Sequence, residues 1–155
     1  MANVLIGSYT AKLDASGRIK IPQKFREVIE QVYGKDLFVT SLSDDSIKVY
    51  PLGVWLSMTD LAAEGAVHLR PDARRFMLRV NRDGSRHELD SKGRVLISQA
   101  LREKAKLRDE VEVLGLSNHL EIWNKDVLDE TLEEKPLSDE DFESIARLMP
   151  RGKPE

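Results

Sequence analysis

The sequence predicts an α+β fold, mainly β, made of two tandem repeats with packing helices between and after them. Residues 13–29, LDASGRIKIPQKFREVI, return at residues 89–105 as LDSKGRVLISQALREKA, with eight identities in seventeen positions. Each copy joins short period-two runs, which are typical of strands, to a run of helical period. Because one such unit exposes an apolar face that it cannot bury alone, the two copies are expected to pack together.

The first copy is expected to open with a strand, a tight loop and a short returning strand. Tyr9, Ala11 and Leu13 alternate with polar residues, which is the pattern of a half-buried strand. After the loop, Ile19 and Ile21 are separated by one lysine, so both side chains should face the same inward side.

A short helix is expected to follow the returning strand. Phe25, Ile29 and Val32 have helical spacing. Pro22 suits the first helical position and Gly34 suits the end of the helix. The sequence therefore predicts one amphipathic helix that packs under the strands.

The second copy repeats these elements with a different helix cap. Val95 and Ile97 form the inward pair again, and Ser98 replaces the proline, so its hydroxyl can cap the helix. The resemblance continues more weakly between residues 39–51 and 113–124. These two segments predict a second hairpin in each copy.

Helices are also expected outside the two copies. Residues 51–65 and 70–80 predict two helices between them. The first helix carries an apolar stripe that is interpreted as core or subunit interface, formed by Trp55, Met58, Leu61 and Ala62. After Trp123 the pattern indicates a helix capped by Asn124, a break at Pro136, a last helix opened by Ser138 or Asp139, and a loose end over residues 150–155.

Composition excludes several classes of function. No apolar run approaches the roughly 20 residues that span a bilayer, and the first residues lack the basic start of an export signal. The chain has no cysteine, so a cytoplasmic protein without disulfides or thiolate metal sites is expected. His68, His87 and His119 are scattered and no catalytic or phosphate-binding motif occurs. The chain is therefore not expected to be an enzyme or to need a metal or cofactor.

Charge is distributed unevenly along the chain. Residues 126–146 hold nine acidic residues and one lysine, a net charge of −8, which leaves +5 for the rest. A mildly basic body can present a local patch for nucleic acid although the whole chain carries −3. The expected domains are 1–80, with the first repeat and its helices, 81–125, with the second repeat, and 126–155, an acidic helical segment with a loose tail.

The repeated loop has the pattern D-x-x-G-R. Aspartate and glycine occupy the favoured first and fourth positions of a type I turn, where the carboxylate can accept backbone N–H groups and glycine tolerates a positive φ. The loop-structuring residues are therefore Asp14, Gly17, Asp90 and Gly93.

The arginine after the glycine has two possible roles. Arg18 and Arg94 can each turn back on the loop aspartate as a structural ion pair, or project from the loop toward DNA. A guanidinium offers a planar fork that suits phosphate oxygens or guanine O6 and N7, and a two-stranded ribbon fits the major groove. Nearby cations are predicted to contact the DNA backbone, namely Lys12, Lys20, Lys92 and Arg86.

Two copies of D-x-x-G-R, each followed by apolar-x-apolar and a short helix containing Arg-Glu, resemble the MraZ family of bacterial transcriptional regulators. The resemblance covers residues 5–147 and extends in fold to the AbrB and MazE swapped-hairpin proteins. It implies a nucleoid-associated, ring-like homo-oligomer that represses or otherwise regulates its own division and cell-wall operon by binding short direct repeats of double-stranded DNA. It also implies that Arg18 and Arg94 read bases or phosphates, while Asp14 and Asp90 orient them.

The resemblance implies that the two AbrB-like repeats close one interlocked, pseudo-dimeric β-barrel. Two positions depart from strict repetition: Leu96 replaces Lys20, and Ser98 replaces Pro22. The first change leaves less positive charge near the second loop. Neither change alters the aspartates or arginines of the motif.

An alternative function is an antitoxin-like interaction module that binds a basic partner through the acidic C-terminal segment. The charge of residues 126–146 favours this reading, since acidic extensions are often interaction tails. Apolar spacing in VLDETL and FESIARLM instead favours packing on the body or on a neighbouring subunit. Removing residues 126–155 would discriminate between the two functions.

Overall fold

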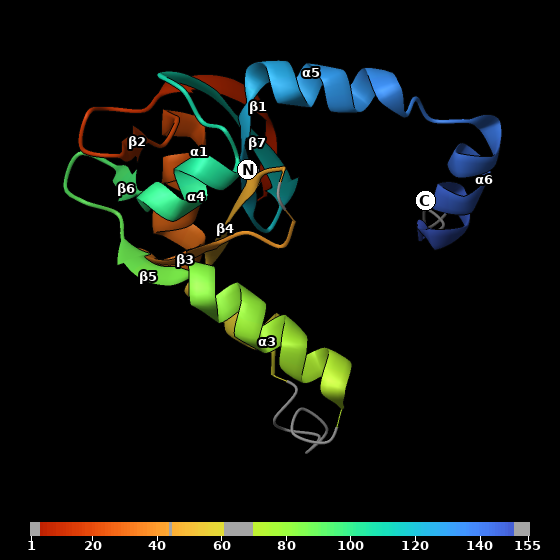
Figure 1. Cartoon of the computed structure of the whole chain (residues 1–155), viewed down its shortest axis with the longest axis horizontal. Coiled ribbons are helices and arrows are strands. Elements are labelled where there is room, and N and C mark those ends of the chain that lie inside the picture. The colour runs from red at the N-terminus through yellow and green to blue at the C-terminus, as the bar shows by residue number, and fades with distance from the viewer. Residues whose placement is uncertain (1–3, 44, 61–69, 151–155) are drawn as a thin grey trace, which may run out of the picture. The chain divides into compact units, whose positions relative to one another are not determined.

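The computed structural model describes residues 4–43, 45–60 and 70–150 (Figure 1). Contacts divide the chain into two compact units, residues 1–125 and residues 126–155. The strands are β1 (Leu5–Lys12), β2 (Arg18–Lys20), β3 (Asp36–Thr40), β4 (Ile47–Pro51), β5 (Ser85–Glu88), β6 (Arg94–Leu96), β7 (Glu110–Ser117) and β8 (Leu120–Asn124). The helices are α1 (Gln23–Val28), continued by a π-helical turn (Ile29–Tyr33), then α2 (Leu52–Met58), α3 (Pro71–Asp83), α4 (Gln99–Lys104), α5 (Lys125–Glu134) and α6 (Asp139–Leu148).

The strands form two antiparallel sheets. Six strands pair in the order β1-β7-β8-β4-β3-β5, and β2 pairs with β6 as a separate two-stranded ribbon. The mainly antiparallel α+β class predicted from the sequence is therefore confirmed. The closed, pseudo-dimeric β-barrel that the resemblance implies is not found among the described strands. The three-residue strands β2 and β6 pair with each other and leave β1 and β5 as edges of the larger sheet.

Pairing between the two copies holds the first unit together. β1 pairs with β7, β2 with β6, β3 with β5, and β4 with β8, so each strand before α2 has a partner from the second half of the unit. Neither copy can complete its sheet without the other. This is the mutual packing that the repeat predicts.

The inward residues of the ribbon are buried as predicted. Ile19, Ile21, Val95 and Ile97 are at most 1% exposed and belong to one core with residues from both sheets. Full burial of each such side chain is worth roughly 1.5 to 3 kcal/mol relative to exposure. The ribbon therefore packs on the core through these four side chains, and its opposite face points away from the core.

The two equivalent helices begin and end by different devices. Pro22 is the N-cap of α1 rather than its first helical residue, whereas the Ser98 hydroxyl caps α4 by accepting the Leu101 N–H at 3.3 Å. The predicted inward position of Val32 is wrong, since this side chain is 44% exposed. The π-helical turn rotates it off the apolar face, and Gly34 ends the segment with φ +90°.

The segment between the copies packs through a second, smaller aromatic cluster. Trp55 of α2 is buried and stacks on Phe38 with ring centroids 4.7 Å apart, and Val80 of α3 joins this cluster. Met58 is 49% exposed, so it does not share the buried face of Trp55. Leu61 and Ala62 lie outside the described residues.

The second unit holds most of α5 and all of α6. Helix α6 begins at the predicted cap, because the Ser138 hydroxyl accepts the Asp141 N–H and the Asp141 carboxylate accepts the Ser138 N–H. Every residue from Leu132 to Pro150 is exposed. In the part of the chain that the structure describes, no helix is both long and apolar enough to cross a membrane.

Candidate nucleic-acid interface

The first loop is folded around the carboxylate of Asp14. Its Oδ1 accepts the backbone N–H groups of Ser16 at 3.0 Å and Arg18 at 2.9 Å, and the Ser16 hydroxyl at 2.9 Å. Gly17 donates its N–H to the Asp14 carbonyl at 3.1 Å and has φ +85°. The aspartate therefore satisfies the donors of the turn, and glycine permits the exit conformation.

The second loop has the same backbone design. Asp90 Oδ1 accepts the N–H groups of Lys92 and Arg94, both at 2.9 Å. Gly93 donates its N–H to the Asp90 carbonyl at 2.9 Å and has φ +74°. The first loop leads into β2 and the second leads into β6. Because these two strands pair in one ribbon, both copies of the motif belong to the same structural element.

Backbone hydrogen bonds lower the pKa of both loop aspartates. For Asp14 the largest cause is the Arg18 N–H, with smaller contributions from Ser16 and the Arg94 charge. For Asp90 the largest cause is the Arg94 N–H, followed among the lowering contacts by the Arg94 side chain. Both carboxylates are therefore ionised at neutral pH and remain available to hold the turns.

The register of the ribbon gathers cations on its outward face. Arg18 lies opposite Leu96, and Lys20 lies opposite Arg94. Alternate residues of a strand point to opposite faces, and the intervening Ile19 and Val95 are buried. Three cations and one leucine therefore lie on the side that faces away from the core.

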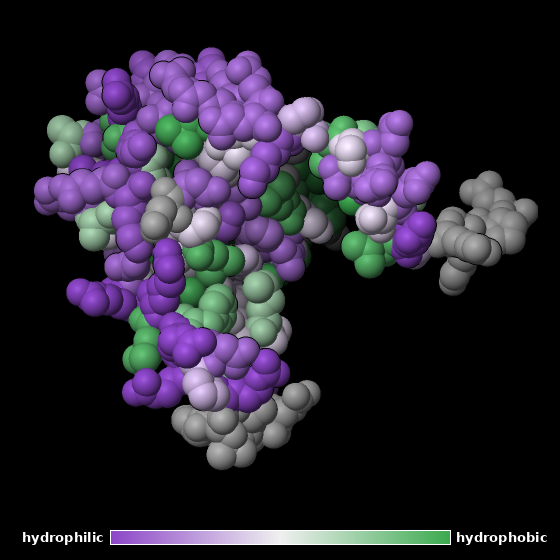
Figure 2. Space-filling view, turned by 45° about the vertical axis from the view of Figure 1, so that its right-hand side comes forward, coloured by the Kyte–Doolittle hydropathy of each residue, from purple (hydrophilic) through white to green (hydrophobic). Residues whose placement is uncertain are grey.

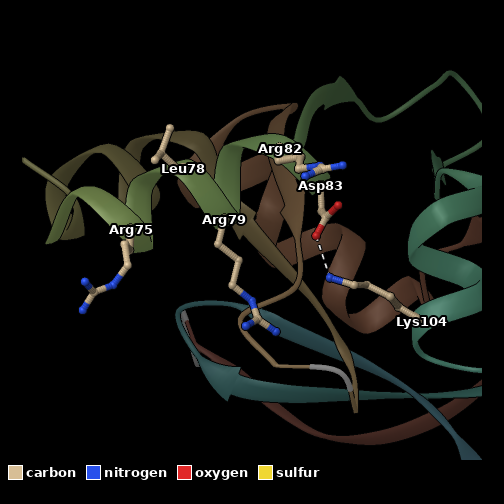
Figure 3. Close-up of a pocket in the computed structure, with 6 residues that line it drawn as sticks. All are labelled: Arg75, Leu78, Arg79, Arg82, Asp83 and Lys104. Atoms are coloured by element: carbon tan, nitrogen blue, oxygen red, sulfur yellow. Dashed lines mark hydrogen bonds and ion pairs between the residues drawn. The ribbon is translucent and has the colours of Figure 1, made fainter. Parts of the chain in front are cut away.

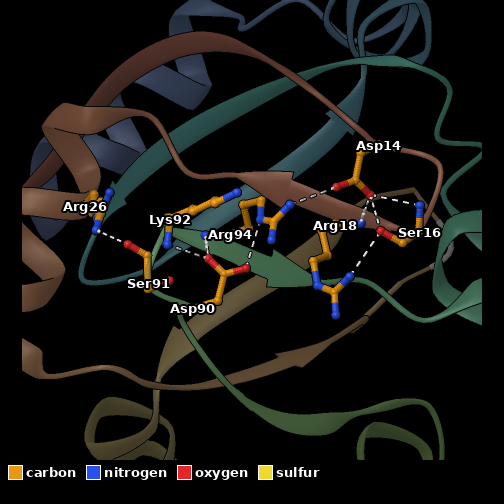
Figure 4. A network of polar contacts seen from close by, with 8 residues as sticks. All are labelled: Asp14, Ser16, Arg18, Arg26, Asp90, Ser91, Lys92 and Arg94. Atoms are coloured by element: carbon orange, nitrogen blue, oxygen red, sulfur yellow. Dashed lines mark hydrogen bonds and ion pairs between the residues drawn. The ribbon is translucent and has the colours of Figure 1, made fainter.

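The two motif arginines are held differently (Figure 4). The Arg94 Nε donates to Asp90 Oδ2 at 2.8 Å, and its Nη1 lies 3.7 Å from Asp14 Oδ2 in the other loop. The Arg18 Nη1 donates to the Ser16 hydroxyl at 3.1 Å, and within the described ranges this arginine has no carboxylate partner. Because a guanidinium has five N–H donors, Arg18 keeps more of them open to a ligand than Arg94 does.

The other predicted contacts are distributed unequally. Lys12 and Lys20 line the same open hollow beside the ribbon, and Lys92 is exposed at the tip of the second loop. Arg86 lies on β5, at the edge of the larger sheet, where its Nη2 is 3.3 Å from Asp36 Oδ1. The three lysines therefore lie near the loops and the ribbon. Arg86 lies instead on the six-stranded sheet, where Asp36 on the neighbouring strand is its carboxylate partner.

Sequence reasoning missed a second pair of arginines. Arg26 of α1 lies against Gly93 and donates to the Ser91 carbonyl at 3.2 Å. Arg102 of α4 lies against Gly17 in the same way, and its Nε is buried without a hydrogen-bond partner in the described chain. Each loop therefore rests on a helix arginine of the other copy. Arg26 and Arg102 align with each other in the two copies of the repeat. The sequence could have pointed to them because this position is an arginine in both copies.

The described histidines do not form a metal or catalytic cluster. His87 contacts the Ser85 hydroxyl at 2.6 Å, and burial lowers the pKa of its ring. His119 lies in the β7–β8 turn and stacks on Tyr50 with centroids 4.5 Å apart. His68 lies outside the described residues. Across residues 4–43, 45–60 and 70–150, no group of three histidine, aspartate or glutamate side chains is placed to hold a metal ion.

Comparison with known proteins places the chain in a family. A family model described as "MraZ protein, putative antitoxin-like" matches residues 82–148. A protein of Acidobacterium capsulatum named "Transcriptional regulator MraZ" is 33% identical over 142 residues, which is 92% of this chain and 97% of that protein. Proteins with the same name are 35% identical over 148 residues in Corynebacterium jeikeium, covering 94% and 100% of the two chains, and 32% identical over 139 residues in Finegoldia magna, covering 90% and 94%. The chain therefore belongs to the MraZ family of transcriptional regulators.

Proposed function

We propose that the chain is a sequence-specific DNA-binding transcriptional regulator that contacts DNA through the outward face of the β2–β6 ribbon. One observation carries the proposal: the antiparallel register gathers Arg18, Lys20 and Arg94 on the face opposite the buried Ile19 and Val95. The names of the relatives support regulation of transcription. Relatives and ribbon together favour DNA as the ligand.

The ribbon has a shape and chemistry that suit the major groove, which admits a two-stranded β element. Arg18 is the stronger candidate for a bidentate contact to guanine or phosphate, because among the described residues only the Ser16 hydroxyl engages its side chain. Arg94 is restrained by Asp90 and Asp14, so it approaches DNA with a fixed orientation. Asp14 and Asp90 are proposed to set the loops, since each accepts two backbone N–H groups of its own turn.

The lysines near the loops are proposed to contact the DNA backbone. Lys12, Lys20 and Lys92 are all exposed, and each can place an ammonium group near a phosphate. Arg86 stays a weaker candidate, because it lies on the six-stranded sheet rather than on the ribbon and its ion pair with Asp36 would compete with such a contact. Neutralising phosphates releases counterions, so the lysines should contribute mainly to affinity and salt dependence.

We further propose that the chain acts as a homo-oligomer on short direct repeats upstream of its own division and cell-wall operon. Direct repeats suit subunits arranged head to tail, whereas a simple two-fold dimer suits a palindrome. A ring would present several modestly binding ribbons at regular spacing, and linked sites gain avidity through effective concentration.

The test is fluorescence anisotropy of the purified protein over a salt series. The two duplexes are the DNA upstream of its own gene and a shuffled sequence of equal length. Wild type should bind the natural DNA more tightly with a steep salt dependence, and Arg18→Ala with Arg94→Ala should lose most of that preference, about 1 to 3 kcal/mol for each bidentate contact. If the double variant prefers the natural over the shuffled duplex as strongly as wild type does, the two arginines only stabilise the turns. Equal binding of both duplexes by wild type would reject the DNA function.

One observation also favours the alternative function, in which the acidic C-terminal segment binds a basic protein partner. Residues 126–146 carry −8, and α6 is exposed along its whole length. Deleting residues 126–155 decides between the functions. Retained DNA binding with lost self-assembly supports the regulator, whereas loss of a co-purifying basic protein supports the interaction module.

A further inference from the structure

The glycine of the first loop is held by residues of the second copy of the repeat. The Gly17 carbonyl accepts the Ile97 N–H at 2.8 Å. A Cβ built on Gly17 would lie 3.0 Å from Cζ and 3.2 Å from Nε of Arg102, so the guanidinium of this α4 residue lies directly against the loop. Because Gly17 immediately precedes Arg18, a shift of the glycine would move the arginine that follows it.

The second loop is held in the same way by the first copy. The Gly93 carbonyl accepts the Ile21 N–H at 2.9 Å, and Arg26 of α1 lies against the same glycine. The Arg26 Nη2 also donates to the Ser91 carbonyl at 3.2 Å (Figure 4), and its Nε donates to Glu30 at 2.9 Å. The two copies therefore hold each other's loops through equivalent arginines.

Burial distinguishes these two helix arginines from other cations of the first unit. Hydrophilic residues predominate on the face of this unit that Figure 2 shows, so an exposed cation there is not by itself informative. Arg26 and Arg102 are instead partly buried, and the Nε of Arg102 is buried without a hydrogen-bond partner in the described chain. An unpaired buried donor is costly. The fold therefore keeps Arg102 against the loop in spite of that cost.

The helix that carries Arg102 has a fixed position. The Ser98 hydroxyl caps its first turn, and Leu101 is fully buried in the core. At its other end, the Lys104 Nζ contacts Asp83 Oδ2 at 2.6 Å, at the end of α3 (Figure 3). Helix α4 is thus attached on both sides of Arg102, which makes it a rigid support for the first loop.

We propose that the two helix arginines are positioning residues for DNA recognition by the opposite copy. Arg102 holds the first loop so that Arg18 is presented to DNA. Arg26 holds the second loop so that Arg94 is presented. A loop that is already ordered before binding avoids part of the entropy cost of ordering its side chain on the DNA. The inference rests on the proposed function, because it names the residues that orient the two motif arginines.

The two helix arginines are expected to differ in the size of their effect. Among the described residues only the Ser16 hydroxyl engages the side chain of Arg18, whereas two carboxylates engage Arg94. The direction of Arg18 therefore depends more on its loop. Arg102→Ala should lower the preference for natural over shuffled DNA about 2- to 12-fold, which corresponds to the ordering of one side chain. Arg26→Ala should lower it less.

Two double-mutant cycles test the positioning roles. The preference is the ratio of the dissociation constants for the shuffled and natural duplexes, measured by fluorescence anisotropy. Arg102→Ala should have little further effect on this ratio once Arg18 is alanine, but should keep its effect when Arg94 is alanine. Arg26→Ala should show the opposite pattern. A general loss of stability would not produce this pairing, because it would affect both motif arginines alike.

Two further variants serve as controls. Lys24 is exposed on α1, so Lys24→Ala removes the same charge as Arg26→Ala and should leave the preference unchanged. Arg102→Met keeps an unbranched side chain against Gly17 without the charge, and should retain most of the preference. Circular dichroism and urea unfolding report whether each variant is folded, and Arg102→Met replaces Arg102→Ala if the alanine variant is not.

The contradicting results are distinct from one another. The inference is overturned if each helix arginine acts additively with both motif arginines, or if Arg102→Met is as defective as a folded Arg102→Ala. Equal losses on both duplexes, with a salt slope reduced by about one, would instead make Arg102 a direct phosphate contact. If wild type shows no preference, or if the motif variants keep it, the proposed function itself is rejected before the helix variants are compared.

Discussion

Replacing Gly93 by alanine tests whether the second loop is held in place by the helix of the first copy. Gly93 has φ +74°, and a Cβ there would lie 2.7 Å from Cδ of Arg26 and 2.8 Å from its Nε. The left-handed backbone costs a side chain about 1 to 2 kcal/mol. Moving Arg26 also gives up its hydrogen bond to the Ser91 carbonyl, about 0.5 to 1.5 kcal/mol. The expected loss of stability is therefore about 1.5 to 3.5 kcal/mol.

Two other glycines provide matched controls. Gly34 has φ +90° with no atom within 4 Å of an added Cβ, so Gly34→Ala should show the backbone cost alone, about 1 to 2 kcal/mol. Gly53 lies in α2 with ordinary φ and open space, so Gly53→Ala should stabilise the protein by about 0.5 to 1 kcal/mol.

Urea unfolding followed by circular dichroism measures all three free energies of unfolding. Adding Arg26→Ala to Gly93→Ala should recover the part of the loss that comes from crowding, which a double-mutant cycle detects as coupling. If Gly93→Ala costs no more than Gly34→Ala, and Arg26 shows no coupling to it, the packing of the loop on Arg26 contributes nothing to stability.

Three further predictions concern the motif and the helix cap. Arg18→Ala should cost more of the preference for natural DNA than Arg94→Ala, measured by anisotropy, because Asp90 and Asp14 already engage Arg94. Because both loop aspartates have lowered pKa values, the stability they contribute is present above about pH 3.9, their unfolded value, and is lost as pH falls through the folded pKa. The urea midpoint of Asp14→Asn with Asp90→Asn should therefore fall less than that of wild type as the pH is lowered below about 3.9. Ser98→Ala should lower the free energy of unfolding by about 0.5 to 2 kcal/mol through loss of the α4 cap, measured in urea.

Each of these three has a contradicting result. Equal losses for the two arginine variants would mean that the ion pairs of Arg94 do not limit its contact with DNA. A parallel acid dependence in wild type and in the asparagine variant would mean that the loop carboxylates are not the groups that titrate with folding. Ser98→Thr, which keeps the hydroxyl, is the conservative control. An unchanged urea midpoint for Ser98→Ala would mean that the Ser98 cap does not contribute to stability.

The repeated pattern was sufficient to predict the framework of the first unit, and local capping rules predicted where α6 begins in the second. The inward pair of the ribbon, the Ser98 cap and the Ser138 start of α6 all follow from local rules that depend only on neighbouring residues. The strands of the two copies also pair with one another, as the apolar face of each copy requires.

The helix irregularity, the strand order and the contacts between the loops could not be predicted from local sequence patterns. The π-helical turn that exposes Val32 inserts one residue into the helical repeat, and no residue type marks it. The larger sheet stays open because β2 and β6 pair with each other and not with its edge strands. Sequence patterns predict strands but not which strands pair. The different restraint of Arg18 and Arg94 arises from contacts between loops that are far apart in sequence, such as Arg94 with Asp14.

The most direct test of the central claim is Arg18→Lys, because it keeps the charge and removes the planar fork. Anisotropy is measured on natural and shuffled DNA over a salt series, for wild type and this variant. The account predicts that the salt dependence stays near that of wild type, while the preference for natural DNA falls about 5- to 150-fold, the equivalent of 1 to 3 kcal/mol for a lost bidentate contact. A variant that keeps the full preference would contradict the claim that the Arg18 guanidinium reads DNA from the ribbon.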